Sequence, residues 1–171
     1  MLVDRGSFFS YTPCNNHTGH GFYQFSPEVF YRIFNETNGF EACDILLELH
    51  PFPGAELSAS KTLYRVIDPE VVNSRVGLVS KTPVMMLVHA VKKETKEIFQ
   101  KYPIQSDYVN TYKAYSEHRG GDEKRNARVF RQFLRSIFKL LPRYIRSHIT
   151  GYRQLKIYNI KNAKFYTKRN F

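Results

Sequence analysis

The chain has 171 residues, of which 42% are hydrophobic and 15% aromatic, and its formal net charge is +11. This length suits one ordinary domain, and the apolar content excludes a chain that is disordered throughout. No apolar run is long enough to cross a bilayer. The two cysteines, Cys14 and Cys43, form no motif with each other, so we expect free thiols in a reducing cytoplasm.

The positive charge belongs to the second half of the sequence. Residues 1–91 contain 6 Lys/Arg and 9 Asp/Glu, whereas residues 92–171 contain 20 Lys/Arg and 6 Asp/Glu. This shift is the clearest boundary signal in the chain. It predicts two parts, an α/β part over 1–91 and a basic, mostly helical extension over 92–171.

The first half reads as strands and helices joined by short turns. A short aromatic strand over 7–11 precedes Pro13, which we expect to end the strand because proline cannot donate to a ladder. Ser26 and Pro27 then form a helix start. The remaining elements predicted for this half are a helix over 27–34 with its stop at 38–39, buried strands over 40–49 and 83–91, and an extended segment over 63–69. This order predicts the second half of an open α/β sheet.

The connection over residues 12–25 carries more varied hydrogen-bonding chemistry than a surface turn needs. It holds two Asn, two His, two Gly and a Tyr-Gln pair. Binding groups are commonly mounted on loops that a rigid scaffold positions. We therefore expect this loop to face a ligand.

The second half is predicted to begin with a short charged helix or linker over 92–102, followed by an irregular Tyr-rich segment over 103–115 and a flexible turn over 118–124. Apolar residues then recur at a helical period over 129–141, with basic residues on the other side. Pro142 ends or kinks this helix, which 143–149 can restart. The last residues, 156–171, alternate basic and aromatic side chains and are expected to fray.

Three interpretations of the basic amphipathic helix remain open. Its apolar face can dock on the rest of the protein, which leaves a solvated basic face. It can adsorb to a membrane surface, with Arg and Lys against anionic lipid. Nucleic-acid binding is the least favoured of the three, because no recognised reader motif accompanies the charge.

The run from Gly19 to Glu28, preceded by Asn15 and Asn16, resembles the segment that follows the fifth strand in class I S-adenosylmethionine-dependent methyltransferases. The closest group is the one found with bacterial surface-polysaccharide and other glycan biosynthesis. Weaker likeness continues through 30–34, 38–41, 64–69, 75–79 and 83–91. The resemblance covers about the first half of the chain and leaves the basic half outside it.

The resemblance implies a partial Rossmann-like methyltransferase sheet, containing the last strands only, followed by a basic helical tail. It implies S-adenosylmethionine as cofactor and methyl transfer to a glycan or glycan precursor. The family's glycine-rich turn and its acidic residue at a strand end are missing from this sequence. We therefore expect a fragment that lacks the cofactor-binding half, inactive as an isolated chain. The alternative is a non-catalytic remnant or partner subunit whose tail binds a membrane surface or an anionic partner.

The candidate site residues all lie on the loop. His20 and His17 are the candidate bases, because an imidazole titrates near neutral pH. Asn15, Asn16 and Gln24 are candidates for hydrogen bonds to sugar hydroxyls, and Tyr23 for stacking or donation. A purely structural interpretation has Asn15 and Asn16 building the turn, His20 capping the helix and the aromatic residues Phe22, Tyr23 and Phe25 in the core. No metal ligands are expected.

These interpretations also predict the partners and the location. The expected ligand is a glycan or nucleotide-sugar acceptor, and a separate chain is expected to supply the missing N-terminal half. We expect a cytoplasmic protein that can lie against the inner face of the membrane through anionic lipid. The strand over 7–11 should present an unpaired edge unless the tail covers it.

Overall fold

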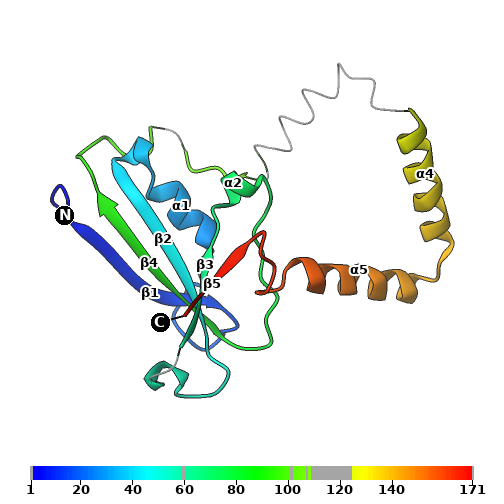
Figure 1. Ribbon diagram of the computed structural model, residues 1–171, viewed down its shortest axis with the longest axis horizontal. Helices are drawn as coiled ribbons and strands as arrows, with labels where there is room; N and C mark the ends of the chain where they lie inside the picture. The colour runs from blue at the N-terminus through cyan, green and yellow to red at the C-terminus, as the bar shows by residue number, and fades with distance from the viewer. Residues whose placement is uncertain (1, 59–60, 101, 107, 109–124, 171) are drawn as a thin grey trace.

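The computed structural model describes residues 2–58, 61–100, 102–106, 108 and 125–170. These residues form a mixed α/β structure around a five-stranded sheet in the order β1-β4-β2-β3-β5, in which every described pairing is antiparallel (Figure 1). The strands are β1 (Ser7–Asn15), β2 (Phe40–Leu49), β3 (Thr62–Val66), β4 (Val84–Lys92) and β5 (Tyr166–Asn170). The helices are α1 (Pro27–Ile33), α2 (Pro69–Val72), α4 (Arg125–Leu140) and α5 (Arg143–Ile157), with single 3-10 turns η1 (Glu36–Asn38) and η2 (Ala55–Leu57).

Strand β4 lies between β1 and β2 and runs antiparallel to both. In the middle of the sheet Val88 pairs with Ser10 on one side and with Ile45 on the other. Because both neighbours oppose β4, β1 and β2 run parallel to each other with one strand between them. Helix α1 connects them, so the three elements form a split β-α-β unit.

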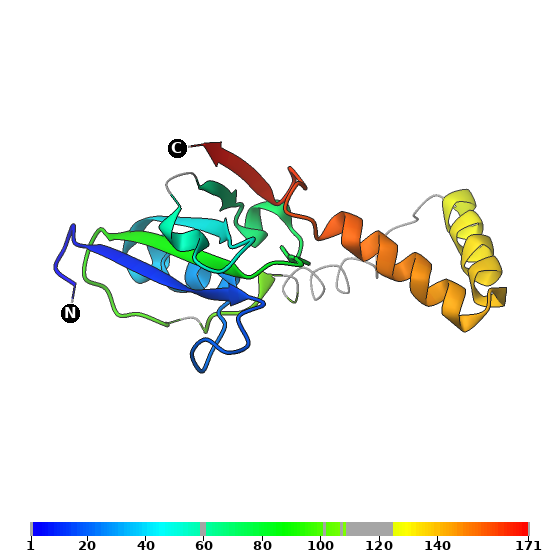
Figure 2. The ribbon, with the colours of Figure 1, turned by 90° about the horizontal axis from the view of Figure 1, so that it is seen from below.

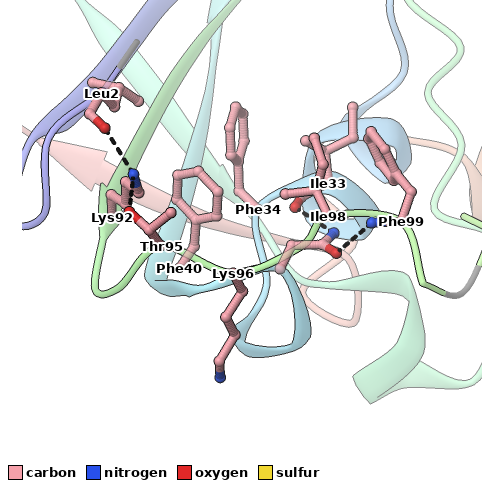
Figure 3. A pocket seen from close by; sticks show the side chains of 10 residues that line it. Leu2, Ile33, Phe34, Phe40, Lys92, Thr95, Lys96, Ile98 and Phe99 are labelled. Carbon is pink, nitrogen blue, oxygen red and sulfur yellow. Dashed lines mark hydrogen bonds between the residues drawn. The ribbon is translucent and has the colours of Figure 1, made fainter.

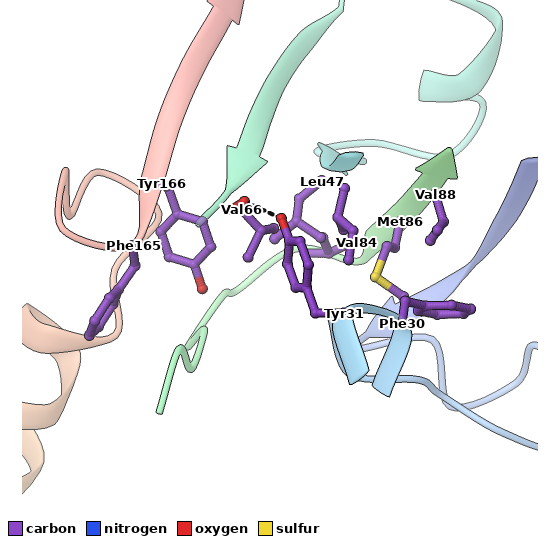
Figure 4. Packing of buried hydrophobic residues seen from close by; sticks show 10 residues of the cluster. Phe30, Tyr31, Leu47, Val66, Val84, Met86, Val88, Phe165 and Tyr166 are labelled. Carbon is purple, nitrogen blue, oxygen red and sulfur yellow. Dashed lines mark hydrogen bonds between the residues drawn. The ribbon is translucent and has the colours of Figure 1, made fainter. Parts of the chain in front are cut away.

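The core lies between α1 and one face of the sheet. The side chains of Ile45, Met86 and Val88 are 0–1% exposed, because β2 and β4 are interior strands of the sheet. Phe30 and Tyr31 of α1 pack onto this face (Figure 4). The Tyr31 hydroxyl donates to the carbonyl of Val66 at 2.6 Å, which satisfies the one polar group that the tyrosine brings into the core. The buried core consists of Phe30, Tyr31, Ile45, Leu47, Val66, Val84, Met86, Val88, Phe165 and Tyr166.

The expected strands over 40–49 and 83–91 are confirmed, and the expected helix over 27–34 ends one residue earlier. Pro27 occupies the first turn of α1, but the Ser26 side chain makes no capping hydrogen bond. Gly39 follows η1 with φ of +82°, so the predicted left-handed stop is present one 3-10 turn beyond the helix.

The expectation that Pro13 ends the first strand is wrong. Strand β1 continues to Asn15, and Pro13 pairs with Met85 before the register shifts at Cys14. Proline is tolerated here because β1 is an edge strand. A residue whose backbone nitrogen faces the open side has no strand to donate to, so the missing N–H of proline costs no hydrogen bond of the sheet. The extra length carries the strand directly into the Asn/His loop.

The expected frayed end is also wrong for residues 166–170, which form β5 against β3. The side chains of Phe165 and Tyr166 are buried, and the Tyr166 hydroxyl donates to the carbonyl of Gly77 at 2.9 Å. The end of the basic half therefore returns to the sheet of the first half and covers the β3 edge. Among the described residues, β4 is the one strand that pairs with β1. The other side of β1 is therefore an open edge of the sheet, as expected.

Helices α4 and α5 confirm the predicted break at Pro142 and project away from the sheet (Figures 1 and 2). Residues 93–100 form an irregular linker rather than a helix. Most of the predicted Tyr-rich segment and the turn over 118–124 lie outside the described residues. Among the helices that the structure describes, none combines the length and the apolar character needed to cross a membrane.

Gly39 is the glycine whose replacement should cost the most. A Cβ there would lie 2.4 Å from the carbonyl oxygen of Glu94, and the positive φ disfavours any other residue. We predict that Gly39→Ala lowers the free energy of unfolding by about 2 kcal/mol or more, measured by urea denaturation. Gly19→Ala is the matched control, because its Cβ would meet open space. Equal stability of the two variants would contradict this packing.

Candidate functional site

A cleft of about 710 Å³ opens at one end of the sheet, where β1 and β2 both finish. Its walls come from the loop after β1, the loop after β2 and the first residues of β4. The residues that line it are Tyr11, Asn16, His17, Thr18, Gly19, His20, His50, Pro51, Phe52, Pro53, Gly54, Pro83 and Met85. We call it the histidine cleft. It lies at the carboxyl ends of two parallel strands, the edge where open α/β sheets bind ligands.

Three imidazoles meet in the histidine cleft. The ring of His17 lies 5.3 Å from that of His20 and 5.9 Å from that of His50, measured between centroids. The loop after β1 supplies the first two and the loop after β2 supplies the third. The structure thus brings the two predicted bases together and adds a histidine from a segment more than thirty residues away along the chain.

A buried carboxylate, that of Glu48, lies against two residues that line the cleft, Tyr11 and His50. The side chain of Glu48 is 4% exposed, accepts a hydrogen bond from the Tyr11 hydroxyl at 3.1 Å and pairs with Lys61 at 3.0 Å. The same hydroxyl lies 3.0 Å from Nε2 of His50. Because the tyrosine gives its proton to Glu48, it accepts from His50, which favours the His50 tautomer with hydrogen on Nε2.

Electrostatics favour the neutral form of His17. Desolvation, then the nearby His20 and His50, lower the pKa of its imidazole from the ordinary 6.5. Its Nε2 is shielded from solvent and has no hydrogen-bond partner among the described residues. A neutral imidazole has one acceptor nitrogen, and it can take a proton or a hydrogen bond from a ligand hydroxyl at pH 7.

The predicted sugar-binding amides hold the loop in place. The Asn16 amide donates to the carbonyls of Ser80 at 2.6 Å and Thr82 at 3.3 Å, and the Asn15 amide donates to Leu78 at 3.3 Å. The Gln24 side chain accepts from the backbone N–H of His17 at 3.3 Å. These contacts give the three amides a structural role, and Asn16 also lines the cleft. Their role in sugar binding stays a prediction.

None of the three loop aromatics, Phe22, Tyr23 and Phe25, is buried in the core, contrary to the structural interpretation. Phe22 is fully exposed and Tyr23 is 73% exposed, so neither belongs to the core. Phe25 contacts Phe30 of α1, with ring centroids 5.8 Å apart. The expected capping of α1 by His20 is not seen, since no side chain caps this helix. Tyr23 lies outside the lining of the histidine cleft, and its proposed stacking role stays a prediction.

Sequence reasoning missed His50, Glu48 and Tyr11. His50 looked like part of a Pro-rich turn, and Glu48 and Tyr11 looked like strand residues. The signal in the sequence that could have identified His50 is its position at the end of a strand. His50 follows directly on a buried strand, as the Asn/His loop follows on β1, and strands of the same direction finish at the same edge.

A second, smaller pocket of about 250 Å³ lies between α1, η1 and the 93–100 linker (Figure 3). Its walls are mainly the side chains of Ile33, Phe34, Phe40 and Ile98. The ammonium of Lys92 donates to the Leu2 carbonyl and to Thr95, so its charge is already engaged. We regard this pocket as part of the packing of the linker rather than as a site.

Neither cysteine has the character of a nucleophile. Burial raises the pKa of the Cys14 thiol to about 11 and that of Cys43 to about 12. Both therefore stay protonated near neutral pH, where a thiol is a poor nucleophile. Across residues 2–58, 61–100 and the other described segments, no group of three or more His, Cys, Asp or Glu side chains is placed to hold a metal ion.

Comparison with known proteins gives no relative. No protein-family model matches the chain, and neither the curated proteins nor the solved structures contain a significant match to it. The functional assignment therefore rests on the geometry of the histidine cleft and on the residue pattern of its loop.

The lowered pKa of His17 can be tested by following the imidazole signals with pH by NMR. We expect His17 to titrate below 6.5, and we expect His20→Gln and His50→Gln each to raise its midpoint by removing a neighbouring charge. Because the unfolded chain would bind more protons below pH 6.5, His17 makes folding less favourable as the pH falls through that window. His89→Gln is the control, since His89 stacks on Phe9 elsewhere on the sheet. A His17 midpoint that neither variant moves would contradict the cluster.

Proposed function

We propose that this chain contributes the acceptor-binding side of an S-adenosylmethionine-dependent methyltransferase that acts on a glycan or a glycan precursor. The histidine cleft would hold the sugar. The observation that supports this proposal best is the position of the cleft at the common carboxyl edge of β1 and β2, with His17, His20 and His50 facing one another.

The topology is compatible with a Rossmann-like origin. A β-α-β connection between parallel strands is the unit from which such sheets are built, and sheets of this kind accommodate an antiparallel strand. Here β4 is that strand, inserted between β1 and β2. We therefore propose that the five strands correspond to the end of a larger sheet, which would continue from the open edge of β1.

The described residues do not fit the cofactor. Gly19 has open space around it, and within the described segments no glycine-rich turn leads from a strand directly into the first turn of a helix. The carboxylate of Glu48, beside the cleft residues Tyr11 and His50, is buried and engaged by Lys61 and Tyr11. We therefore assign only the acceptor to this chain and place the cofactor on a partner chain or segment that pairs along β1.

The cleft residues can orient and polarise a hydroxyl group. Neutral His17 can accept the proton of a sugar hydroxyl. The rings of His20 and His50 each contact the ring of His17. Tyr11 and Glu48 favour one tautomer of His50, which fixes which of its ring nitrogens carries the hydrogen before a ligand binds. Positioning of this kind is what a transfer to a weakly acidic oxygen requires.

Sugar binding can be measured directly by saturation-transfer NMR and calorimetry with UDP-glucose and a neutral trisaccharide. We expect both to bind, and we expect His17→Ala and His50→Gln each to weaken binding by about fivefold or more, the worth of one hydrogen bond. His89→Gln should leave the affinity unchanged. Circular dichroism establishes that each variant is folded. No binding of either sugar, or equal binding by all three variants, would refute the assignment of the cleft.

Calorimetry with S-adenosylmethionine tests the proposal that this chain binds the acceptor and not the cofactor. We expect no binding, or binding no tighter than about 1 mM, because the described residues offer no cradle for the cofactor. A titration of the same preparation with UDP-glucose is the control, because it shows that the protein can bind a ligand. Micromolar affinity for the cofactor would show that this chain holds the whole site.

A further inference from the structure

Helices α4 and α5 leave large apolar side chains in water. Leu140 is 84% exposed and Phe133 is 60% exposed, and no residue of α5 is buried. Both views show the two helices extending away from the sheet (Figures 1 and 2). Among the described residues nothing covers them. We call α4 and α5 together the basic arm.

The side chains of α4 divide into two faces. Phe133, Leu134, Ile137 and Leu140 recur at spacings of three and four residues, and Arg135 and Lys139 lie on the opposite side. Helix α5 adds exposed tyrosines, and the Lys156 ammonium lies 4.9 Å above the ring of Tyr152. An amphipathic helix of this kind needs an apolar phase for one face and water or counter-charge for the other.

The charge of the basic arm has one sign only. Residues 125–157, which span both helices, contain 9 Lys/Arg and no Asp or Glu. The occupant of the arm must therefore be strongly negative, and it must also accept the apolar face of α4. Nucleic acid meets the first requirement but offers no continuous apolar phase. An anionic lipid bilayer meets both, with headgroups for Arg and Lys and acyl chains for Phe and Leu.

We propose that the basic arm binds the surface of anionic lipid bilayers, with the Phe133–Leu140 face of α4 inserted among the acyl chains. The tyrosines of α5 suit the headgroup level, where a ring can be apolar at one end and wet at the other. The proposal does not depend on the histidine cleft. It brings the acceptor site to a surface where lipid-linked sugars would be at hand.

Vesicle co-sedimentation of the full chain tests the binding. We expect binding to phosphatidylcholine vesicles that contain about 30% phosphatidylglycerol, no binding to pure phosphatidylcholine, and at least a tenfold loss between about 50 mM and 500 mM NaCl. The double variant Leu134→Glu/Ile137→Glu should lose binding about tenfold or more. The control is Leu57→Glu, which places one glutamate on an 86% exposed leucine outside the arm, and each single variant, Leu134→Glu and Ile137→Glu, is compared with it at equal charge.

A single tryptophan reports insertion, because the chain has none of its own. Phe133→Trp should show a blue-shifted emission with anionic vesicles, whereas Leu57→Trp should not. Absence of binding at low salt would overturn the proposal, and so would equal binding to both lipids. It would also fail if the double variant bound as well as the parent, or if size exclusion showed that a second copy of the chain already covers the face.

Discussion

The placement of β4 between β1 and β2 is the constraint on which the rest of the structure depends. Val84, Met86 and Val88 belong to the core and are almost fully buried, so apolar burial holds β4 in this position. Being antiparallel to both neighbours, it makes β1 and β2 parallel. Their following loops therefore emerge at the same edge, and the histidine cleft is a consequence of that edge.

A second set of contacts keeps this edge in shape. Asn15 and Asn16 tie the loop after β1 to carbonyls over residues 78–82, just ahead of β4. Glu48 ties the end of β2 to Tyr11 on β1. Each contact joins segments that are distant in the sequence but adjacent at the cleft. The geometry of the three imidazoles is thus held by hydrogen bonds that a rigid sheet positions, which is how a binding site is preorganised.

The elements with a strong local signal were predictable from the sequence. Strand β2 could be located because Ile45, Leu46 and Leu47 form a continuous apolar run between Gly39 and Pro51. Strand β5 could not be located, because Tyr166–Asn170 is largely polar and has no apolar pattern. It is held by its pairing with β3 and by the burial of Tyr166, and both are tertiary contacts. The extension of β1 past Pro13 depended on its edge position, which only the strand order reveals. His17 and His20 were predicted from one loop, whereas His50 and Glu48 required knowledge of which strands finish together.

We propose that a sugar occupies the histidine cleft, which forms at this shared edge. Intermolecular NOEs between a bound trisaccharide and the imidazole protons measure this most directly. We expect NOEs from sugar protons to His17, His20 and His50, and none to His89 on the open face of the sheet. Sugar contacts at His89, or contacts that bypass all three cleft histidines, would contradict this proposal.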